Sequence, residues 1–157
     1  MNSGRRNVPS IDRAFAAYPL RIARSRIHRW GVFAASPIPR GRKVIEYTGE
    51  RIRLREVIAR LRKIMGPHRP RKLCIFRVNR IWRIDGSVGG SGAECINHSC
   101  DPNLRARIIR GHILFFSRRR IRPGEELSLD YKLAPTTFRI RCRCGSPKCR
   151  GFLNRSK

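Results

Sequence analysis

The sequence has few acidic residues and no long apolar segment, and both absences limit what the protein can be. Only 10 of its 157 residues are Asp or Glu, against 37 Lys and Arg, which gives a formal net charge of +27. The longest apolar runs, such as residues 113–116, are far too short for a membrane-spanning helix, which needs about 20 apolar residues. The basic stretch 1–10 is not followed by an apolar segment of signal-peptide length. We therefore expect a soluble intracellular protein that makes no membrane contact.

Internal repeats and low-complexity linkers are also absent. A chain of 157 residues suffices for one domain with small appendages but not for two independent cores. The hydrophobic content of 40% favours a folded chain. In a reducing compartment, six cysteines indicate metal binding rather than disulfides.

The basic residues that are present are mostly arginine, since all but six of the 37 are of this type. Arginine forks match phosphate geometry and stay charged at every physiological pH. Two interpretations stay open, a functional contact with nucleic acid or nucleoprotein, and incidental polyanion affinity caused by arginine-rich codon usage. Both predict binding without sequence preference that weakens with salt.

The apolar pattern is typical of short strands interrupted by one helix. Strand patterns occur at 26–35, 43–47, 73–78, 81–84, 104–109, 112–118 and 127–131. Residues 53–65 differ, because apolar side chains recur there at helical spacing and Gly66-Pro67 follows as a stop signal. Residues 1–17 form a basic arm, mobile unless it docks. The predicted architecture is mostly β, with one amphipathic helix and a cysteine-rich tail.

Four cysteines have the spacing of a metal site. Cys142, Cys144 and Cys149 form a cluster that leaves a tetrahedral zinc one ligand short. The missing thiolate is assigned to Cys100, which lies in the polar run 97–103. Cys74 and Cys95 have no partner at metal spacing and are interpreted as small buried hydrophobes.

Five motifs, each weak alone, occur in a fixed order along the chain. They are RWGVFA at 29–34, EYTGE at 46–50, NHSC at 97–100, EELSLDY at 125–131 and CRCGSPKCRGFL at 142–153. Together they resemble the SET-domain protein-lysine methyltransferases that carry a C-terminal zinc-binding (post-SET) extension. The resemblance covers roughly residues 20–154 and implies a basic N-terminal arm at 1–17, a catalytic SET domain at 18–133 and a zinc-binding tail at 134–157.

The resemblance implies small β-sheets around a pseudoknot, in which the segment after Arg122 is tucked beneath the loop 97–100. Such threading is rare among folds, and it would bring Asn97, His98 and Tyr131 together. It also implies S-adenosylmethionine as cofactor. The implied cofactor contacts are the backbone around Trp30 and Gly31, the Asn97 side chain, the His98 backbone, Tyr47 and the tail residues Phe152 and Leu153.

The chemistry of methyl transfer explains these residue types. A free lysine, with a pKa of about 10.4, is protonated at neutral pH and cannot attack a methyl group. An apolar channel disfavours that charge, and a tyrosine hydroxyl at its end, here Tyr131, aligns the amine. Each residue also has an ordinary alternative: half-buried packing for Tyr131, turn capping for Asn97, a loop histidine for His98, and core packing for Phe152 and Leu153.

Three positions depart from the family pattern. Arg29 replaces the first glycine of the cofactor loop, Cys74 stands where relatives often have a channel tyrosine, and Leu129 stands where they usually have Phe or Tyr. We place Cys74 and Leu129 in the substrate channel. A channel without these hydroxyls leaves room for added methyl groups, so we hypothesise multiple methylation.

The resulting hypothesis is a protein-lysine N-methyltransferase that modifies a histone-like or other basic protein and associates with chromatin or a nucleoid, including that of a host nucleus. The alternative is a non-catalytic, zinc-stabilised nucleic-acid-binding module on a SET fold. A ribosome-associated zinc protein is a third reading, but it leaves the cofactor motifs unexplained. Asn97 and Tyr131 favour the enzyme, because a binding module needs neither.

Overall fold

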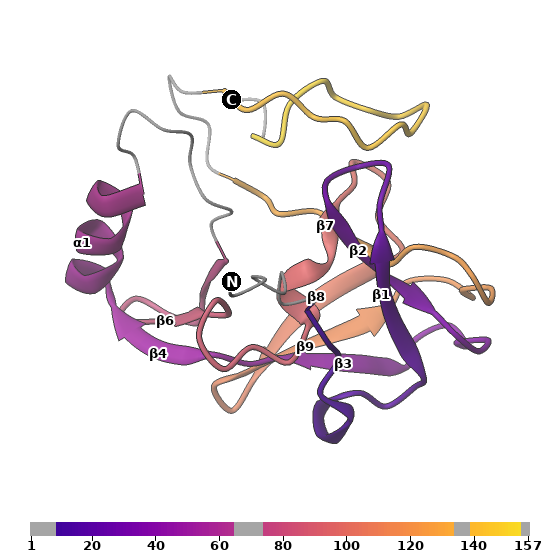
Figure 1. Ribbon diagram of the computed structural model, residues 1–157, viewed down its shortest axis with the longest axis horizontal. Coiled ribbons are helices and arrows are strands. Elements are labelled where there is room, and N and C mark those ends of the chain that lie inside the picture. The colour runs from indigo at the N-terminus through magenta and orange to yellow at the C-terminus, as the bar shows by residue number, and fades with distance from the viewer. Residues whose placement is uncertain (1–8, 65–73, 134–138, 155–157) are drawn as a thin grey trace, which may run out of the picture.

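The computed structural model describes residues 9–64, 74–133 and 139–154. Within these ranges the chain is built from small sheets and a single α-helix (Figure 1). The strands are β1 (Leu20–Arg24), β2 (Trp30–Ala34), β3 (Lys43–Tyr47), β4 (Glu50–Arg53), β5 (Ile75–Arg77), β6 (Trp82–Asp85), β7 (Asn97–His98), β8 (Leu104–Ile109), β9 (His112–Ser117) and β10 (Ser128–Leu129). The α-helix is α1 (Leu54–Ile64), and two short 3-10 helices lie elsewhere in the chain, at Arg13–Phe15 and Ala93–Cys95. The predicted mostly-β class with one helix is confirmed.

The strands form four sheets whose order departs from chain order. Two have three strands, β3-β9-β8 and β4-β6-β5, and two have two strands, the antiparallel pair β1-β2 and the parallel pair β10-β7. In Figure 1, α1 lies beside β4 and β6 at one end, and the C-terminal tail crosses above β7 and β2. No described helix is long and apolar enough to span a membrane.

The β8-β9 hairpin shows how local chemistry sets these elements. Its two turn residues, Arg110 and Gly111, have φ of 51° and 83°, as a tight hairpin turn with right-handed strand twist requires. Along β9, Ile113, Phe115 and Ser117 are buried while the residues between them are not. That alternation places one face of β3-β9-β8 on the core.

The core lies between the sheets and directly beneath segment 96–98. Its fully buried side chains come from several elements and include Val32, Ile38, Val44, Ile45, Leu104, Ile113, Phe115, Ile121 and Leu127. Ile96 and Leu129 belong to the same cluster. The segment that carries the NHSC motif therefore rests on a rigid base.

Several predicted strands are shorter than expected, and the structure gives a physical reason for two of them. The strand predicted at 26–35 covers only Trp30–Ala34, because Arg29 takes a positive φ of 38° that ends the extended conformation. The strand predicted at 127–131 is reduced to Ser128–Leu129, because Asp130 leaves the ladder to bind Arg150. Both predictions were wrong in extent, the first because of a backbone turn at Arg29 and the second because the Asp130 side chain binds Arg150.

The helix prediction at 53–65 is confirmed for Leu54–Ile64, while Met65 and the stop signal Gly66-Pro67 lie outside the described residues. Its apolar stripe is only partly used. Val57 is buried, but Leu54 and Ile58 are 50% and 43% exposed.

The described part of the basic arm, residues 9–17, is docked. The Asp12 amide donates to the Ser91 carbonyl and the Ala17 amide to the Val44 carbonyl, both at 2.9 Å. Ile11 packs against the core.

Candidate active site and metal centre

Segment 126–129 is held between β2 and segment 97–103. The Leu127 amide donates to the Val32 carbonyl at 2.7 Å, and Ser128 and Leu129 pair in parallel with Asn97 and His98. The Asn103 side chain reinforces this contact, since it accepts from the Ser128 amide at 2.8 Å and donates to the Glu126 carbonyl at 2.8 Å. This is the juxtaposition that the resemblance implied for the pseudoknot.

Asn97 connects this segment to the start of β2. Its side chain is buried, and its amide nitrogen donates to the Trp30 carbonyl and to a Glu126 carboxylate oxygen, both at 2.9 Å. The Ser25 hydroxyl donates to the same carboxylate at 2.8 Å. A Cβ at Gly31 would lie 2.3 Å from the Glu126 oxygen, so a larger residue there would displace the Glu126 carboxylate from its hydrogen bonds with Asn97 and Ser25. The structure thus brings Trp30, Gly31 and Asn97 together.

Tyr131 lies on the other side of segment 96–98. Its hydroxyl donates to the Ile96 carbonyl at 2.8 Å, and its amide donates to Nδ1 of His98 at 3.1 Å. Burial raises the pKa of the Tyr131 hydroxyl above its ordinary value, so the hydroxyl keeps its proton near neutral pH.

His98 is buried beside Tyr131. Its ring meets the Tyr131 ring edge-on, with centroids 5.3 Å apart. Burial lowers the pKa of His98 to about 4, so the ring is neutral near pH 7. One ring nitrogen accepts from Tyr131 and the other lies 3.4 Å from the Cys100 sulfur. Both ring nitrogens are therefore engaged by neighbouring groups.

The other predicted pocket residues lie around Cys74. The Tyr47 hydroxyl donates to the Cys74 carbonyl, and its ring packs against Phe76 and Phe115 with centroids 5.5 and 6.0 Å away. Burial raises the pKa of Tyr47, and a charged Cys74 would raise the pKa of both Tyr47 and Tyr131. Leu129 is buried and pairs with His98.

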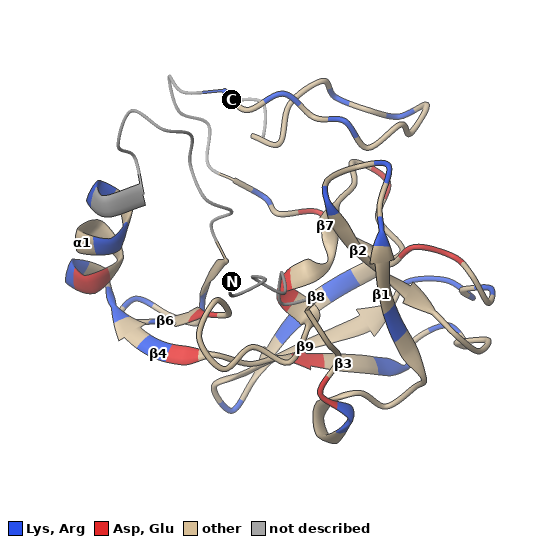
Figure 2. Ribbon diagram, viewed as in Figure 1, with Lys and Arg blue, Asp and Glu red and all other residues tan. Residues whose placement is uncertain are grey.

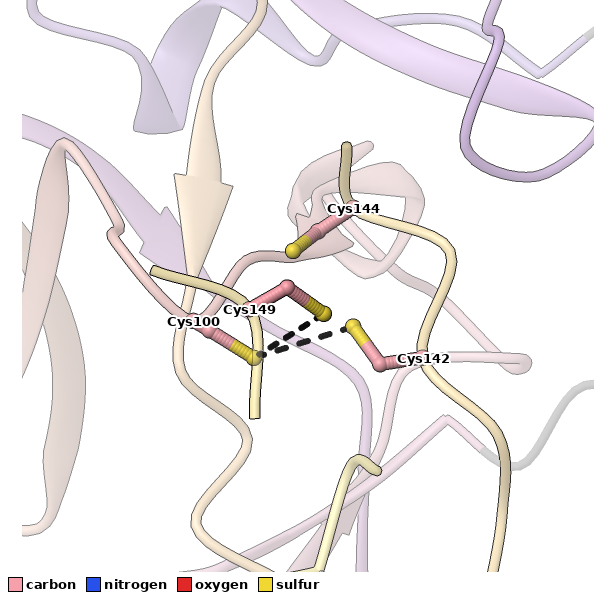
Figure 3. Close-up of side chains that lie close together, drawn as sticks. All are labelled: Cys100, Cys142, Cys144 and Cys149. Carbon is pink, nitrogen blue, oxygen red and sulfur yellow. Dashed lines mark hydrogen bonds between the residues drawn. The ribbon is translucent and has the colours of Figure 1, made fainter. Parts of the chain in front are cut away.

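The four predicted metal ligands come together (Figure 3). The sulfur of Cys100 lies 3.7 Å from that of Cys142 and 4.0 Å from that of Cys149, and all four sulfurs, including that of Cys144, are within 4.8 Å of one another. Tetrahedral zinc with bonds of about 2.3 Å requires sulfurs about 3.8 Å apart. The arrangement therefore fits a four-thiolate zinc site.

Backbone amides around the sulfurs support this fit. The Arg150 amide points at the Cys100 sulfur and the Gly151 amide at the Cys149 sulfur, each at 3.4 Å. Such donors stabilise thiolates that bind a metal. Tight turns carry the ligands, with Gly145 and Gly151 at φ of 69° and 80°.

Arg150 joins the tail to the residue before Tyr131. Its guanidinium donates to both Asp130 carboxylate oxygens, at 2.9 and 3.1 Å, and to the carbonyls of Leu153 and Asn154. Burial alone would raise the pKa of Asp130, but the Arg150 hydrogen bonds outweigh it and the pKa lies below its ordinary value. The carboxylate is therefore charged near neutral pH.

The tail residues Phe152 and Leu153 are half-buried. The Arg139 guanidinium lies 3.8 Å from the Phe152 ring centroid, and the Leu153 amide donates to the Ile140 carbonyl at 2.9 Å. Their contact with a cofactor stays a prediction.

Sequence reasoning missed Ser25, Glu126 and Arg150. The sequence gives a signal for Glu126, because it directly precedes a strand with alternating apolar residues. A carboxylate that is buried with such a strand needs a hydrogen-bond partner. Ser25 and Arg150 show none, since their partners are about 101 and 20 positions away.

Comparison with known proteins agrees with this geometry. The family model described as SET domain matches residues 29–132. The histone-lysine N-methyltransferase TRX1 of Oryza sativa is 40% identical over 86% of this chain, and SETD1B of Homo sapiens is 39% identical over 89%. The H3 lysine-4-specific histone-lysine N-methyltransferase of Saccharomyces cerevisiae is 40% identical over 87%.

The chain spans only 14%, 7% and 13% of the length of these three relatives. The residues matched by the family model contain the motifs at 29–34, 46–50, 97–100 and 125–131. The family match covers most of the chain, and the chain therefore belongs to the SET domain family.

Proposed function

We propose that the chain is a protein-lysine N-methyltransferase that uses S-adenosylmethionine and acts on a histone-like or other basic protein. One observation carries the proposal. In segment 96–98, the Ile96 carbonyl accepts a hydrogen bond from the Tyr131 hydroxyl, and the Asn97 side-chain amide donates one to the Trp30 carbonyl. A candidate catalytic hydroxyl and a candidate cofactor loop are thus oriented by three consecutive residues. A pure binding module has no use for that alignment.

The chain's own groups account for the demands of the reaction. When bound, S-adenosylmethionine supplies an electrophilic methyl on a sulfonium. Because the Tyr131 proton is donated to Ile96, its oxygen lone pairs face an incoming amine as acceptors. The hydroxyl therefore orients the amine rather than removing its proton.

The amine must lose its proton to water before it attacks. The buried surroundings of Leu129 and Tyr47, together with the half-buried Cys74, penalise an ammonium ion and lower the pKa of the substrate lysine on entry. His98 is not needed as a base, because both of its ring nitrogens are occupied. Desolvation in the channel therefore favours the neutral lysine amine, which is the form that can attack.

The four cysteines would hold one zinc with a structural role. A site with four protein ligands has no open position for chemistry. Its effect is to fix residues 142–153 over the body, together with the Arg150 to Asp130 clamp. This supports the division into a catalytic domain at 18–133 and a zinc-binding tail at 134–157.

The substrate class rests on the relatives. Three of them are named histone-lysine N-methyltransferases, and the yeast protein is named for lysine 4 of histone H3. We therefore propose a histone-like substrate and a location at chromatin. The net charge of +27 supports an additional contact with nucleic acid.

The test separates catalysis from cofactor binding. Tyr131→Phe should keep S-adenosylmethionine affinity, measured by calorimetry, while losing at least a hundredfold in radiolabelled methyl transfer to histones. Asn97→Ala should weaken cofactor binding itself, because the Trp30 loop loses its anchor.

Wild-type turnover in Tyr131→Phe would refute the role of that residue. If the folded, zinc-loaded protein transfers no methyl group to histones, ribosomal proteins or cell lysate and binds no S-adenosylmethionine, the non-catalytic nucleic-acid-binding module is the better assignment.

A further inference from the structure

Two basic turns meet at one end of the sheet β3-β9-β8, away from α1. Segments 38–42 and 117–121 run side by side, because Ile38 and Ile121 exchange backbone hydrogen bonds of 3.0 and 2.9 Å. Figure 2 shows Lys and Arg on these turns, at the opposite end of the molecule from the helix, and along β8, which runs across the middle of the view. The charge at this end thus comes from segments that are distant in sequence.

A depression of roughly 280 Å³ opens between the turns and the edge strand β8. It is lined by Arg40, Gly41, Arg105, Ser117 and Arg118. Ser117 forms a rigid floor, since its hydroxyl donates to the Pro39 carbonyl at 2.6 Å and its carbonyl accepts from the Gly41 amide at 2.9 Å. Gly41 has no neighbouring atom within 4 Å of its Cβ position, so the mouth is open.

The three arginines of this depression lack acidic partners. Among the described residues, no carboxylate forms an ion pair with Arg40, Arg105 or Arg118. The side chain of Arg118 donates only to the Pro102 carbonyl, at 3.1 Å. The adjacent Arg119, by contrast, is neutralised by Glu125. Three exposed guanidinium groups around one depression repel each other, and an anion placed there removes the repulsion.

The positive surface continues over the outer face of the sheet. Lys43 on β3, Phe116 on β9 and Arg105 on β8 lie in one cross-strand row. Arg107 follows on the same face of β8, about 7 Å further along, and its guanidinium lies 5.6 Å from the Phe116 ring centroid. The strip ends where Glu46 pairs with His112 at 2.7 Å.

We propose that the depression formed by Arg40, Arg105 and Arg118, extended by Lys43 and Arg107, is a docking site for the phosphodiester backbone of nucleic acid. Guanidinium forks match phosphate oxygens in pairs. The extended strip fits a polymer with regularly repeated charges better than it fits a single anion. Contacts to backbone phosphates carry no sequence information, so we expect binding that is independent of sequence. This site is separate from the one that contains Tyr131 and does not depend on methyl transfer.

The test compares two variants with equal loss of charge. The site variant is Arg40→Gln/Arg105→Gln/Arg118→Gln. The control is Arg55→Gln/Arg62→Gln/Arg77→Gln, which removes three exposed arginines from α1 and β5 at the other end. Binding to fluorescent duplex DNA and duplex RNA of equal length is followed by anisotropy over a salt series, without cofactor. Thermal unfolding of both variants verifies the fold.

The site variant should lose affinity about tenfold or more at low salt, and the slope of log K against log salt should shrink by about 2.7, which is 0.9 for each lost phosphate contact. The control should change much less. An effect on DNA alone, or on RNA alone, identifies that nucleic acid as the occupant. Equal losses in both variants would overturn the proposal, because they would show that diffuse net charge does the binding. Inorganic phosphate at the same ionic strength should not compete better than chloride; strong competition would instead indicate a site for a small anion.

Discussion

At the scale of single residues, Arg29 is an arginine in a conformation that favours glycine. Its φ of 38° lies in the left-handed region, where a Cβ costs about 1–2 kcal/mol. It stands directly before Trp30, whose carbonyl anchors Asn97. The strain therefore lies in the loop that we propose to hold the cofactor.

Replacing Arg29 by glycine should relieve this strain. We expect Arg29→Gly to exceed Arg29→Ala by about 1 kcal/mol in free energy of unfolding, because both remove the charge but only glycine accepts the positive φ freely. Urea unfolding of the two variants measures the difference. A more stable alanine variant would show that the loop relaxes once the arginine is gone.

Leu129 determines, in our hypothesis, how many methyl groups are added. Leu129→Tyr introduces a hydroxyl that can retain a water beside the amine, and it should shift the product from di- and trimethyl-lysine towards monomethyl-lysine. Mass spectrometry of a peptide substrate over time gives the distribution. Leu129→Phe is the matched control, with similar bulk and no hydroxyl, and an equal shift in both variants would contradict the argument from water.

At the scale of elements, α1 is held to the sheet β4-β6-β5 by one side chain more than by its apolar stripe. Arg60 donates to Glu50 on β4 and to Asp85 on β6, whereas Leu54 and Ile58 stay largely exposed. Burial alone would raise the pKa of Asp85, but hydrogen bonds from Ser87 and Arg60 outweigh it and lower that pKa. The helix is thus attached partly through charge and partly through the buried Val57.

This attachment predicts an acid dependence of stability. An unfolded Asp takes up a proton near pH 3.9, while folded Asp85 resists it, so its stabilising contribution is complete above about pH 4 and disappears as pH falls through the lowered pKa. Arg60→Gln should cost about 1–2 kcal/mol at pH 7 and less at pH 3. Chemical denaturation at both values checks this. Arg55→Gln on the same helix should change stability by under about 0.5 kcal/mol, and an equal loss there would contradict the clamp.

Elements with local signals were predictable and those with distant partners were not. Arg110-Gly111 between two alternating runs marked the β8-β9 hairpin, and the spacing of Leu54, Val57 and Leu61 marked α1. The early end of β10 depends on Arg150, 20 positions away. No local sequence pattern near Asp130 predicts Arg150 as its partner.

At the scale of the whole molecule, the metal site is formed by two segments that are distant in sequence, the one around Cys100 and the C-terminal tail. Cysteine spacing predicted its four ligands, and the structure brings their sulfurs within 4.8 Å of one another. The Ser25, Glu126 and Asn97 network was out of reach, because it depends on how β2 and segment 126–129 pack. Side-chain type gave the chemistry, whereas tertiary packing determined the partners.

Removal of one ligand should release the metal. The purified protein should contain about one zinc per chain, and Cys100→Ser or Cys142→Ser should each lose nearly all of it. Elemental analysis measures the content, and limited proteolysis within residues 139–154 should become faster because the tail is no longer fixed. Cys74→Ser, outside the cluster, should keep its zinc. Full retention in Cys100→Ser would show that the fourth ligand is another group.

The distance between Cys100 and its partners also has a consequence for translation. Cys100 precedes Cys142 by 42 positions, so a ribosome adding 5–20 residues per second needs about 2–8 s to supply the second ligand. During that interval the nascent chain contains Cys100 but none of the other three zinc ligands. A message that ends before the codon for Cys149 would encode a product without this thiolate and without Arg150, so neither the zinc site nor the Asp130 clamp could form.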